Sequence, residues 1–117
     1  MTKPTVLIVE DEDLVLEIAM LEFEDAGFEV LTAENADSAM ARIESGAPID
    51  LLFTDIRMPG KLDGWDIARR AREVRPQLPV IYTTGYSAQA PGAVEGALFF
   101  AKPYRLSEIL SAVHRLI

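Results

Sequence analysis

The chain has 117 residues, half of them apolar, which is enough for one domain with a buried core. Its 19 acidic residues outnumber its 11 basic residues and give a net charge of -8, so we do not expect direct binding to nucleic acid, because phosphate backbones select basic surfaces. The absence of cysteine excludes disulfides and thiolate sites, and without a signal peptide or an apolar run of roughly 20 residues, a soluble cytoplasmic protein with no membrane contact is expected.

The first half of the chain alternates strand-like and helix-like segments. The predicted strands of this half are residues 5–10, 29–33 and 51–54, and the predicted helices are residues 13–26 and 36–45. Asp13 and Asn35 are expected to cap the two helices, and Gly27 to stop the first. The aliphatic runs 5–10 and 51–54 are typical of strands that are buried on both faces.

The second half continues the alternation but lacks one helix signal. The predicted strands are residues 80–83 and 98–101, and the predicted helices are residues 64–74, capped by Asp63, and a last helix ending near Leu116. Residues 58–60 read as a loop. The segment 85–98 contains Pro91, Gly92 and Gly96, which are poor helix residues, so the fourth crossover helix is expected to be short or missing.

Alternating strands and helices with short connections predict one α/β domain over residues 1–117. Such a domain has a parallel sheet, helices on both faces and right-handed crossovers.

Four of the predicted strands end on reactive polar residues, which are Glu10 with Asp11, Asp55, Thr84 and Lys102. The carboxyl ends of parallel strands meet at one edge of a sheet, where open α/β sheets bind ligands. Two like charges 4 Å apart repel by about 4 kcal/mol at a protein surface, so three carboxylates need a cation, or one of them must take up a proton. Oxygen ligands favour Mg²⁺, with Mn²⁺ as the alternative. A lysine and a hydroxyl beside them also suit a phosphoryl group.

Each of these residues also has a simpler structural explanation. Glu12 and Asp13 fit a solvated acidic turn with a helix cap, and Lys102 or Thr84 alone could be an ordinary strand-end residue. Pro103 can form a cis bond that holds the lysine. The combination, rather than any single residue, favours a shared site.

Taken in order and spacing, these residues resemble the receiver domain of two-component response regulators, either stand-alone or within a hybrid kinase. The acidic pair Glu10-Asp11 follows the first strand, and the segment 54–59 looks like the phosphoacceptor motif around Asp55. Thr84 is similar to the switch hydroxyl of the family, and Phe99 to its switch aromatic. Lys102-Pro103 matches the family's lysine-proline pair.

The resemblance implies a flavodoxin-like, doubly wound sheet with strand order 2-1-3-4-5. It also implies that Asp55 takes a phosphoryl group from a phosphohistidine on a histidine kinase or a histidine phosphotransfer protein. Mg²⁺ would be bound by Asp11, Asp55 and the backbone carbonyl of Arg57, with Glu10 helping through water. Such a domain is a signalling switch that promotes its own phosphorylation and dephosphorylation, and is not a metabolic enzyme.

In the same resemblance, Lys102 contacts the acyl phosphate, Thr84 moves toward it, and Phe99 fills the space that Thr84 leaves. Two departures from the family pattern bear on this. The acidic pair is Glu-Asp rather than Asp-Asp, and Phe99 lacks the hydroxyl of a tyrosine.

A partner surface is predicted beside the acidic residues. Val15, Ala19, Phe23 and Ala26 share one helical face that should contact the sheet. Leu14 and Leu21 lie on the other side of this helix, and with Pro103 and Tyr104 they could receive a kinase or phosphotransfer helix. Scattered surface leucines are also normal. The sequence leaves open whether the chain forms a homodimer.

Two other functions stay open. Residues 11–15 fit the start of haloacid-dehalogenase-like phosphatases, with Asp11 as a Mg²⁺-dependent nucleophile, although that reading leaves Asp55 and Lys102 unexplained. The chain could also be a receiver-like interaction module that is never phosphorylated. Replacing Asp55 by asparagine separates the first rival, since a phosphatase would keep a reactive Asp11.

Overall fold

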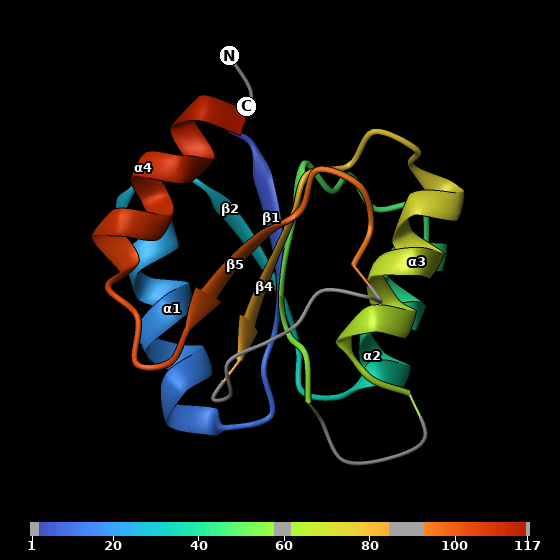
Figure 1. Ribbon diagram of the computed structural model, residues 1–117, viewed down its shortest axis with the longest axis horizontal. Helices are drawn as coiled ribbons and strands as arrows, with labels where there is room; N and C mark the ends of the chain where they lie inside the picture. Colours follow the sequence, from blue (N-terminus) through green and yellow to red (C-terminus); the bar gives the residue numbers. More distant parts are fainter. Residues whose placement is uncertain (1–2, 58–61, 85–92, 117) are drawn as a thin grey trace.

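The computed structural model describes residues 3–57, 62–84 and 93–116 of the chain. They form a five-stranded parallel sheet with strand order β2-β1-β3-β4-β5, as Figure 1 shows. The strands are β1 (Thr5–Val9), β2 (Glu29–Ala33), β3 (Leu51–Asp55), β4 (Val80–Thr84) and β5 (Leu98–Ala101). The helices are α1 (Asp13–Asp25), α2 (Ala36–Glu44), α3 (Gly64–Val74) and α4 (Leu106–Leu116). The predicted elements are confirmed, with ends that differ by one or two residues.

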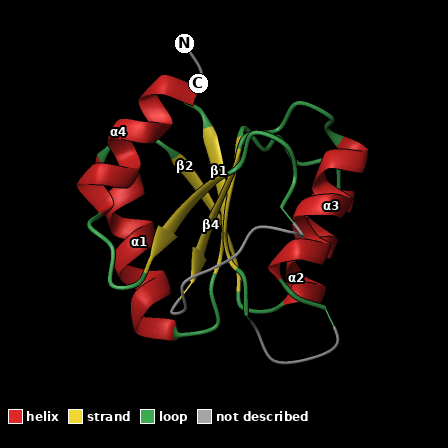
Figure 2. Ribbon diagram, viewed as in Figure 1, coloured by secondary structure: helices red, strands yellow, loops and turns green. Residues whose placement is uncertain are grey.

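The sheet is the middle of three layers. Figure 2 shows α1 and α4 on one face of the sheet and α2 and α3 on the other. Successive side chains of a strand point to opposite faces, so the strands supply two separate cores. Phe23 of α1 and Ile109 of α4 belong to one core, and Ile43 of α2 and Ile67 of α3 belong to the other.

The central strands are aliphatic because helices cover both of their faces. Every residue of β1, β3 and β4 is buried, whereas the edge strands β2 and β5 are partly exposed. The register pairs Val9 with Thr54, and Asp55 with Thr83. The carboxyl ends of β1, β3 and β4 therefore lie side by side.

Local signals fix most helix ends as predicted. The Asn35 side chain accepts a hydrogen bond from the Ser38 N–H at 2.8 Å, and Asp63 forms a reciprocal capping box with Asp66. Gly27, at φ 96°, follows the end of α1 in the left-handed conformation that favours glycine.

The predicted cap of α1 is wrong. Glu12, in an extended conformation, is the N-cap residue, and its side chain makes no capping hydrogen bond. Asp13 is already the first helical residue, because the extended backbone that a cap requires falls one residue earlier. The predicted buried face of α1 holds for Ala19 and Phe23, while Leu16 joins it in place of the half-buried Val15.

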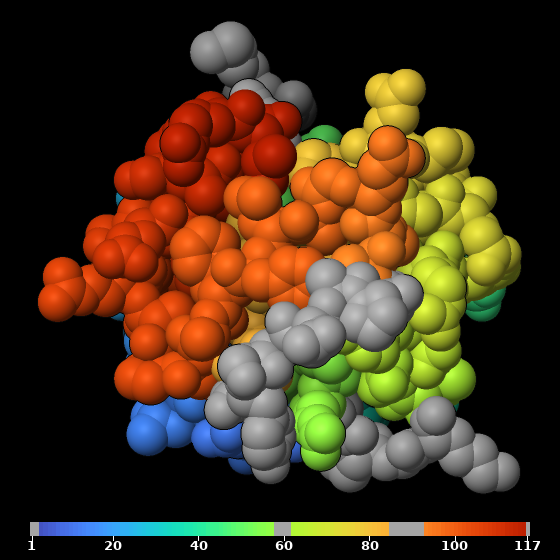
Figure 3. Space-filling model, viewed as in Figure 1, coloured from blue at the N-terminus to red at the C-terminus, as the bar shows by residue number. Residues whose placement is uncertain are grey.

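The connection between β4 and β5 contains no helix in its described part, residues 93–97, as the sequence predicted. The Tyr82 hydroxyl accepts a hydrogen bond from the Val94 N–H at 3.2 Å, and Arg72 donates to the Glu95 carbonyl at 2.8 Å. Figure 3 shows this stretch and β5, in orange, between α4 and α3. The predictions for residues 58–60 and 85–92 lie outside the described residues.

None of the described helices is both long and apolar enough to cross a membrane.

Candidate functional site

The carboxyl edge of the sheet gathers the polar residues that were predicted to meet there. Glu10 follows β1, Asp55 and Thr84 end β3 and β4, and Lys102 follows β5. Backbone hydrogen bonds hold the ends together, because the Lys102 N–H donates to the Thr84 carbonyl at 2.7 Å and the Ile56 N–H to the Thr83 carbonyl at 3.0 Å. Residues up to 92 positions apart in the sequence thus share one site.

Lys102 joins two carboxylates from different strands. Its Nζ lies 2.7 Å from Oε1 of Glu10 and 2.9 Å from Oδ2 of Asp55. The Glu10 and Asp55 side chains are only 4% and 8% exposed, so these are strong, charge-assisted hydrogen bonds shielded from water. Burial acts to lower the pKa of Lys102, but hydrogen bonds and charges from Glu10 and Asp55 outweigh it and raise the pKa. The amine is therefore a cation at neutral pH.

Glu10 is fixed at both carboxylate oxygens. Oε1 accepts from Lys102, and Oε2 accepts from the Glu12 N–H at 3.1 Å. Burial raises the pKa of Glu10, and the hydrogen bonds from Lys102 and from the Glu12 backbone act in the opposite direction. Glu10 thus forms a direct ion pair with Lys102, which the sequence did not predict.

Asp55 is held by its own loop as well as by Lys102. Its Oδ1 accepts a hydrogen bond from the Arg57 N–H at 3.3 Å, and its backbone carbonyl accepts from the Thr54 hydroxyl at 2.9 Å. The orientation of the Asp55 carboxylate is therefore fixed, because one oxygen accepts a hydrogen bond from Lys102 and the other accepts one from the Arg57 N–H.

The start of α3 presses against this loop at Gly64. The Gly64 N–H donates to the Ile56 carbonyl at 2.8 Å. A Cβ on Gly64 would lie 2.3 Å from the Asp55 carbonyl oxygen and 2.8 Å from the Ile56 Cα, so only glycine fits there. Sequence reasoning did not find this contact, although a glycine directly after the Asp63 cap was an available signal.

Asp11 completes a group of acids that suits metal binding. Oxygen atoms of Glu10, Asp11 and Asp55 all lie within 4.8 Å of one another, with Asp11 exposed and the other two buried. Three carboxylates that converge from two strand ends offer the hard oxygen ligands that Mg²⁺ and Mn²⁺ prefer. The residues present therefore fit a divalent cation.

Phe99 belongs to an aromatic cluster that consists of Trp65, Tyr82 and Phe99. The ring centres of Tyr82 and Phe99 are 5.1 Å apart, and Trp65 lies 4.7 Å from Tyr82 and 5.9 Å from Phe99. Thr84 follows Tyr82 by two residues on the same face of β4 and is buried. The two predicted switch residues therefore lie on neighbouring strands, and Trp65 of α3 packs beside Phe99.

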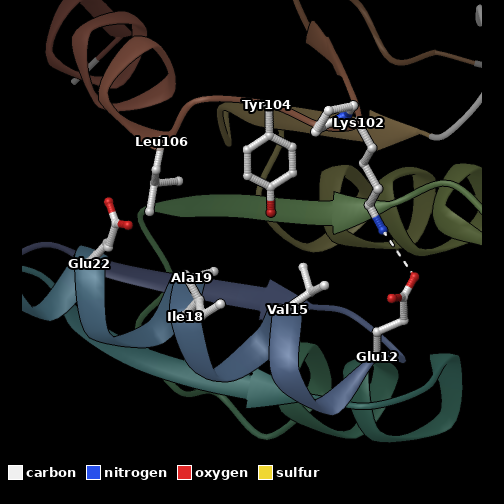
Figure 4. A pocket seen from close by; sticks show the side chains of 9 residues that line it. Glu12, Val15, Ile18, Ala19, Glu22, Lys102, Tyr104 and Leu106 are labelled. Carbon is white, nitrogen blue, oxygen red and sulfur yellow. Dashed lines mark ion pairs between the residues drawn. The ribbon is translucent and has the colours of Figure 1, made fainter.

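A groove opens beside Lys102, between α1 and the residues that follow β5. Figure 4 shows Val15, Ile18 and Ala19 of α1 facing Tyr104 and Leu106 across it. Its volume is about 510 Å³. Burial raises the pKa of the Tyr104 phenol to about 12, so the ring stays neutral at physiological pH.

Exposed apolar residues extend the groove along α1. Leu14, Ile18 and Leu21 are 69%, 50% and 53% exposed and follow one another at helical spacing. Leu14 and Leu21 thus point to solvent as predicted, while Ile18 was not singled out. Pro103 lines the groove with Tyr104, and the Lys102-Pro103 bond is cis.

Comparison with known proteins identifies the family. The family model of the response regulator receiver domain matches residues 6–114 of this chain. The response regulator receiver protein CpdR of Brucella abortus is 32% identical over 116 residues, which cover 96% of this chain and 95% of that protein.

Solved structures agree in fold over nearly the whole chain. A response regulator receiver protein from Sinorhizobium medicae has 34% identity and a TM-score of 0.93, covering 97% of this chain and 94% of that one. The response regulator TrrA from Thermotoga maritima, solved in complex with Mg²⁺ and BeF, has 28% identity and a TM-score of 0.87, covering 97% of this chain and 99% of that one.

Proteins of this kind are signalling domains of two-component systems, and they interact with histidine kinases or phosphotransfer proteins. The predicted strand order 2-1-3-4-5 and the predicted family are both confirmed. This chain, with its acidic site at the carboxyl edge of the sheet, belongs to the response regulator receiver domain family.

Proposed function

We propose that the chain, as a receiver domain over residues 1–117, accepts a phosphoryl group on Asp55 from a phosphohistidine of a histidine kinase or a histidine phosphotransfer protein. The observation that carries this proposal is the placement of the Asp55 carboxylate, with Lys102 Nζ at 2.9 Å and the Arg57 N–H at 3.3 Å. Phosphoryl transfer asks mainly for positioning and neutralisation of charge, and this arrangement provides both.

The metal that the site would hold is Mg²⁺, with Mn²⁺ as the alternative. Asp11, Asp55 and the backbone carbonyl of Arg57 are its proposed ligands, with Glu10 acting through a bound water. The convergence of the three carboxylates supports the assignment. When bound, the ion would neutralise charge on the carboxylates and on the phosphoryl oxygens.

The step uses a carboxylate as the nucleophile. An Asp55 oxygen attacks phosphorus, the new O–P bond forms while the P–N bond to histidine breaks, and the histidine nitrogen keeps that electron pair and takes a proton from solvent. Lys102 already donates a hydrogen bond to one Asp55 oxygen, and it would pair with a phosphoryl oxygen as negative charge develops on that oxygen. Hydrolysis of the acyl phosphate returns the domain to its unphosphorylated state. The domain thus promotes both its own phosphorylation and its own dephosphorylation, and acts as a signalling switch rather than as an enzyme.

The proposed switch links the site to the aromatic cluster. New charge on Asp55 attracts the Thr84 hydroxyl, and Phe99 moves toward the space that Thr84 leaves. The direct register between Tyr82 and Phe99 supports this coupling, because a shift of one ring must be accommodated by the other.

The donor is proposed to dock on Leu14, Leu21, Pro103 and Tyr104, across the groove beside Lys102. The exposed leucines and the apolar walls of the groove support a helix with an apolar ridge as the docking element. The domain would meet its donor in the bacterial cytoplasm.

An Asp55→Asn variant tests the proposal against its two rivals. We expect a phosphorylated histidine phosphotransfer protein to label the wild-type chain but not the Asp55→Asn variant. Label that persists in Asp55→Asn and disappears in Asp11→Asn would favour a phosphatase that uses Asp11. No label in any variant, together with partner binding that ignores Mg²⁺, would favour an unphosphorylated interaction module.

A further inference from the structure

A third carboxylate lies near the ammonium group of Lys102. Oε1 of Glu12 lies 3.9 Å from Lys102 Nζ, the same ammonium that binds Glu10 and Asp55, as the dashed line in Figure 4 shows. Unlike those two, Glu12 is 66% exposed, and it lines the groove beside Lys102. Glu12 therefore lies between the solvent-exposed groove and the buried ion pairs.

The local backbone explains why the Glu12 side chain is available for this contact. Glu12 is the N-cap residue of α1, and a shorter Asp, Ser or Asn there would fold back onto the helix N–H groups. The Glu12 side chain makes no such bond, while its N–H is anchored on Oε2 of Glu10. The backbone of residue 12 is thus fixed to the site, and the longer side chain extends toward Lys102.

The contact has a consequence for the charge of an incoming donor. Glu12 adds a negative charge beside the acidic group of Glu10, Asp11 and Asp55, of which Glu10 and Asp55 pair with Lys102. Repulsion between like charges scales with the product of the charges, so a doubly charged donor experiences about twice the repulsion of a singly charged one. The electrostatic penalty for the approach of a donor therefore depends on the negative charge of that donor.

We propose that Glu12 is a specificity-determining positioning residue, which holds Lys102 and slows phosphoryl transfer from dianionic donors more than from monoanionic donors. The inference rests on the proposed function, because it concerns the rate at which Asp55 is phosphorylated.

Two small donors isolate the effect because they transfer the same group. With acetyl phosphate, a dianion at neutral pH, an Asp55 oxygen bonds to phosphorus while the bond from phosphorus to the acetate oxygen breaks, and acetate leaves. With phosphoramidate, a monoanion whose nitrogen is already protonated, the P–N bond breaks and ammonia leaves. Both reactions give the same acyl phosphate, so the donor charge is the difference of interest.

The experiment compares initial rates of Asp55 phosphorylation with the two donors, in Mg²⁺ at low ionic strength, by intact-mass spectrometry. Glu12→Gln should raise the ratio of the acetyl phosphate rate to the phosphoramidate rate by about two- to fivefold. The increase should shrink in about 0.5 M salt, where screening is strong. Glu12→Asp keeps the charge, but its shorter side chain caps α1 instead of reaching Lys102, so its ratio should lie between those of Glu12→Gln and the wild type.

Glu17→Gln is the matched control, since it removes an exposed acid from the same helix more than one turn farther along. Its donor ratio should stay near that of the wild type. An unchanged ratio in Glu12→Gln, or an equal change in Glu17→Gln, would overturn the inference while leaving Asp55 as the acceptor. Failure of wild-type Asp55 to react with either donor would instead remove the proposed function, and the inference with it.

Discussion

Replacing Gly64 by alanine should displace the backbone of Asp55, although Gly64 has no side chain that takes part in the site. The added methyl group would lie 2.3 Å from the Asp55 carbonyl oxygen, whereas ordinary van der Waals contact begins near 3.4 Å. Either the end of β3 or the start of α3 must then move by about 1 Å, a displacement that can slow a positioned reaction by about a hundredfold. The capping box at Asp63 and the buried Ile67 hold α3 in place. The Asp55–Ile56 peptide is therefore expected to be the part that moves.

The assay measures two quantities on the same samples, the free energy of unfolding in urea and the initial rate of Asp55 phosphorylation. Overpacking of this kind should lower the free energy of unfolding by about 1–3 kcal/mol. The rate should fall by about two orders of magnitude in the fraction that remains folded.

Gly46→Ala provides the control for lost stability. Gly46 has φ +82° with nothing near its added Cβ, so alanine costs about 1 kcal/mol of backbone strain in a turn far from the site. We expect that variant to lose stability and keep its phosphorylation rate. A folded Gly64→Ala variant with the wild-type rate would refute the argument that α3 positions Asp55.

Other predictions address the ion pairs, the aromatic cluster and the α3 cap. Lys102→Met leaves two buried carboxylates without their cation, so without Mg²⁺ it should lower the free energy of unfolding by about 3 kcal/mol. Added Mg²⁺ should stabilise this variant more than it stabilises the wild type. Trp65, the single tryptophan, should change its fluorescence when Mg²⁺ and beryllofluoride are added to the wild type but not to Asp55→Asn. Asp63→Ala should cost about 1 kcal/mol in urea unfolding. A hydrogen bond from the Asp63 backbone lowers the pKa of Asp66, so the stability this bond contributes is present above pH 3.8 and is lost as the pH falls further. An Asp66→Asn variant should therefore lose less unfolding free energy over that pH range than the wild type.

Much of the fold follows from local patterns in the sequence. Continuous aliphatic runs such as residues 51–54 are stable only with both faces covered, which requires a parallel sheet with helices on each side. Once the sheet is parallel, the residues that end its strands meet at one edge. The proximity of Asp55 and Lys102 could therefore be predicted without coordinates.

Details that depend on how elements pack could not be predicted in this way. The approach of Gly64 to the β3 loop is set by the seating of α3 on the sheet, and no local pattern records that distance. The cap of α1 was assigned one residue late because Glu12 and Asp13 are both acidic and only the backbone conformation separates them. The direction of the Glu12 side chain depends on Lys102, which is distant in sequence.

The most direct test of the account is to map the phosphorylated residue. The chain is incubated with Mg²⁺ and a small phosphodonor, the acyl phosphate is reduced with borohydride, and the product is located by peptide mass spectrometry. The account predicts a single modified position at Asp55, lost when Mg²⁺ is chelated. Modification at Asp11, or at any residue other than Asp55, would contradict it.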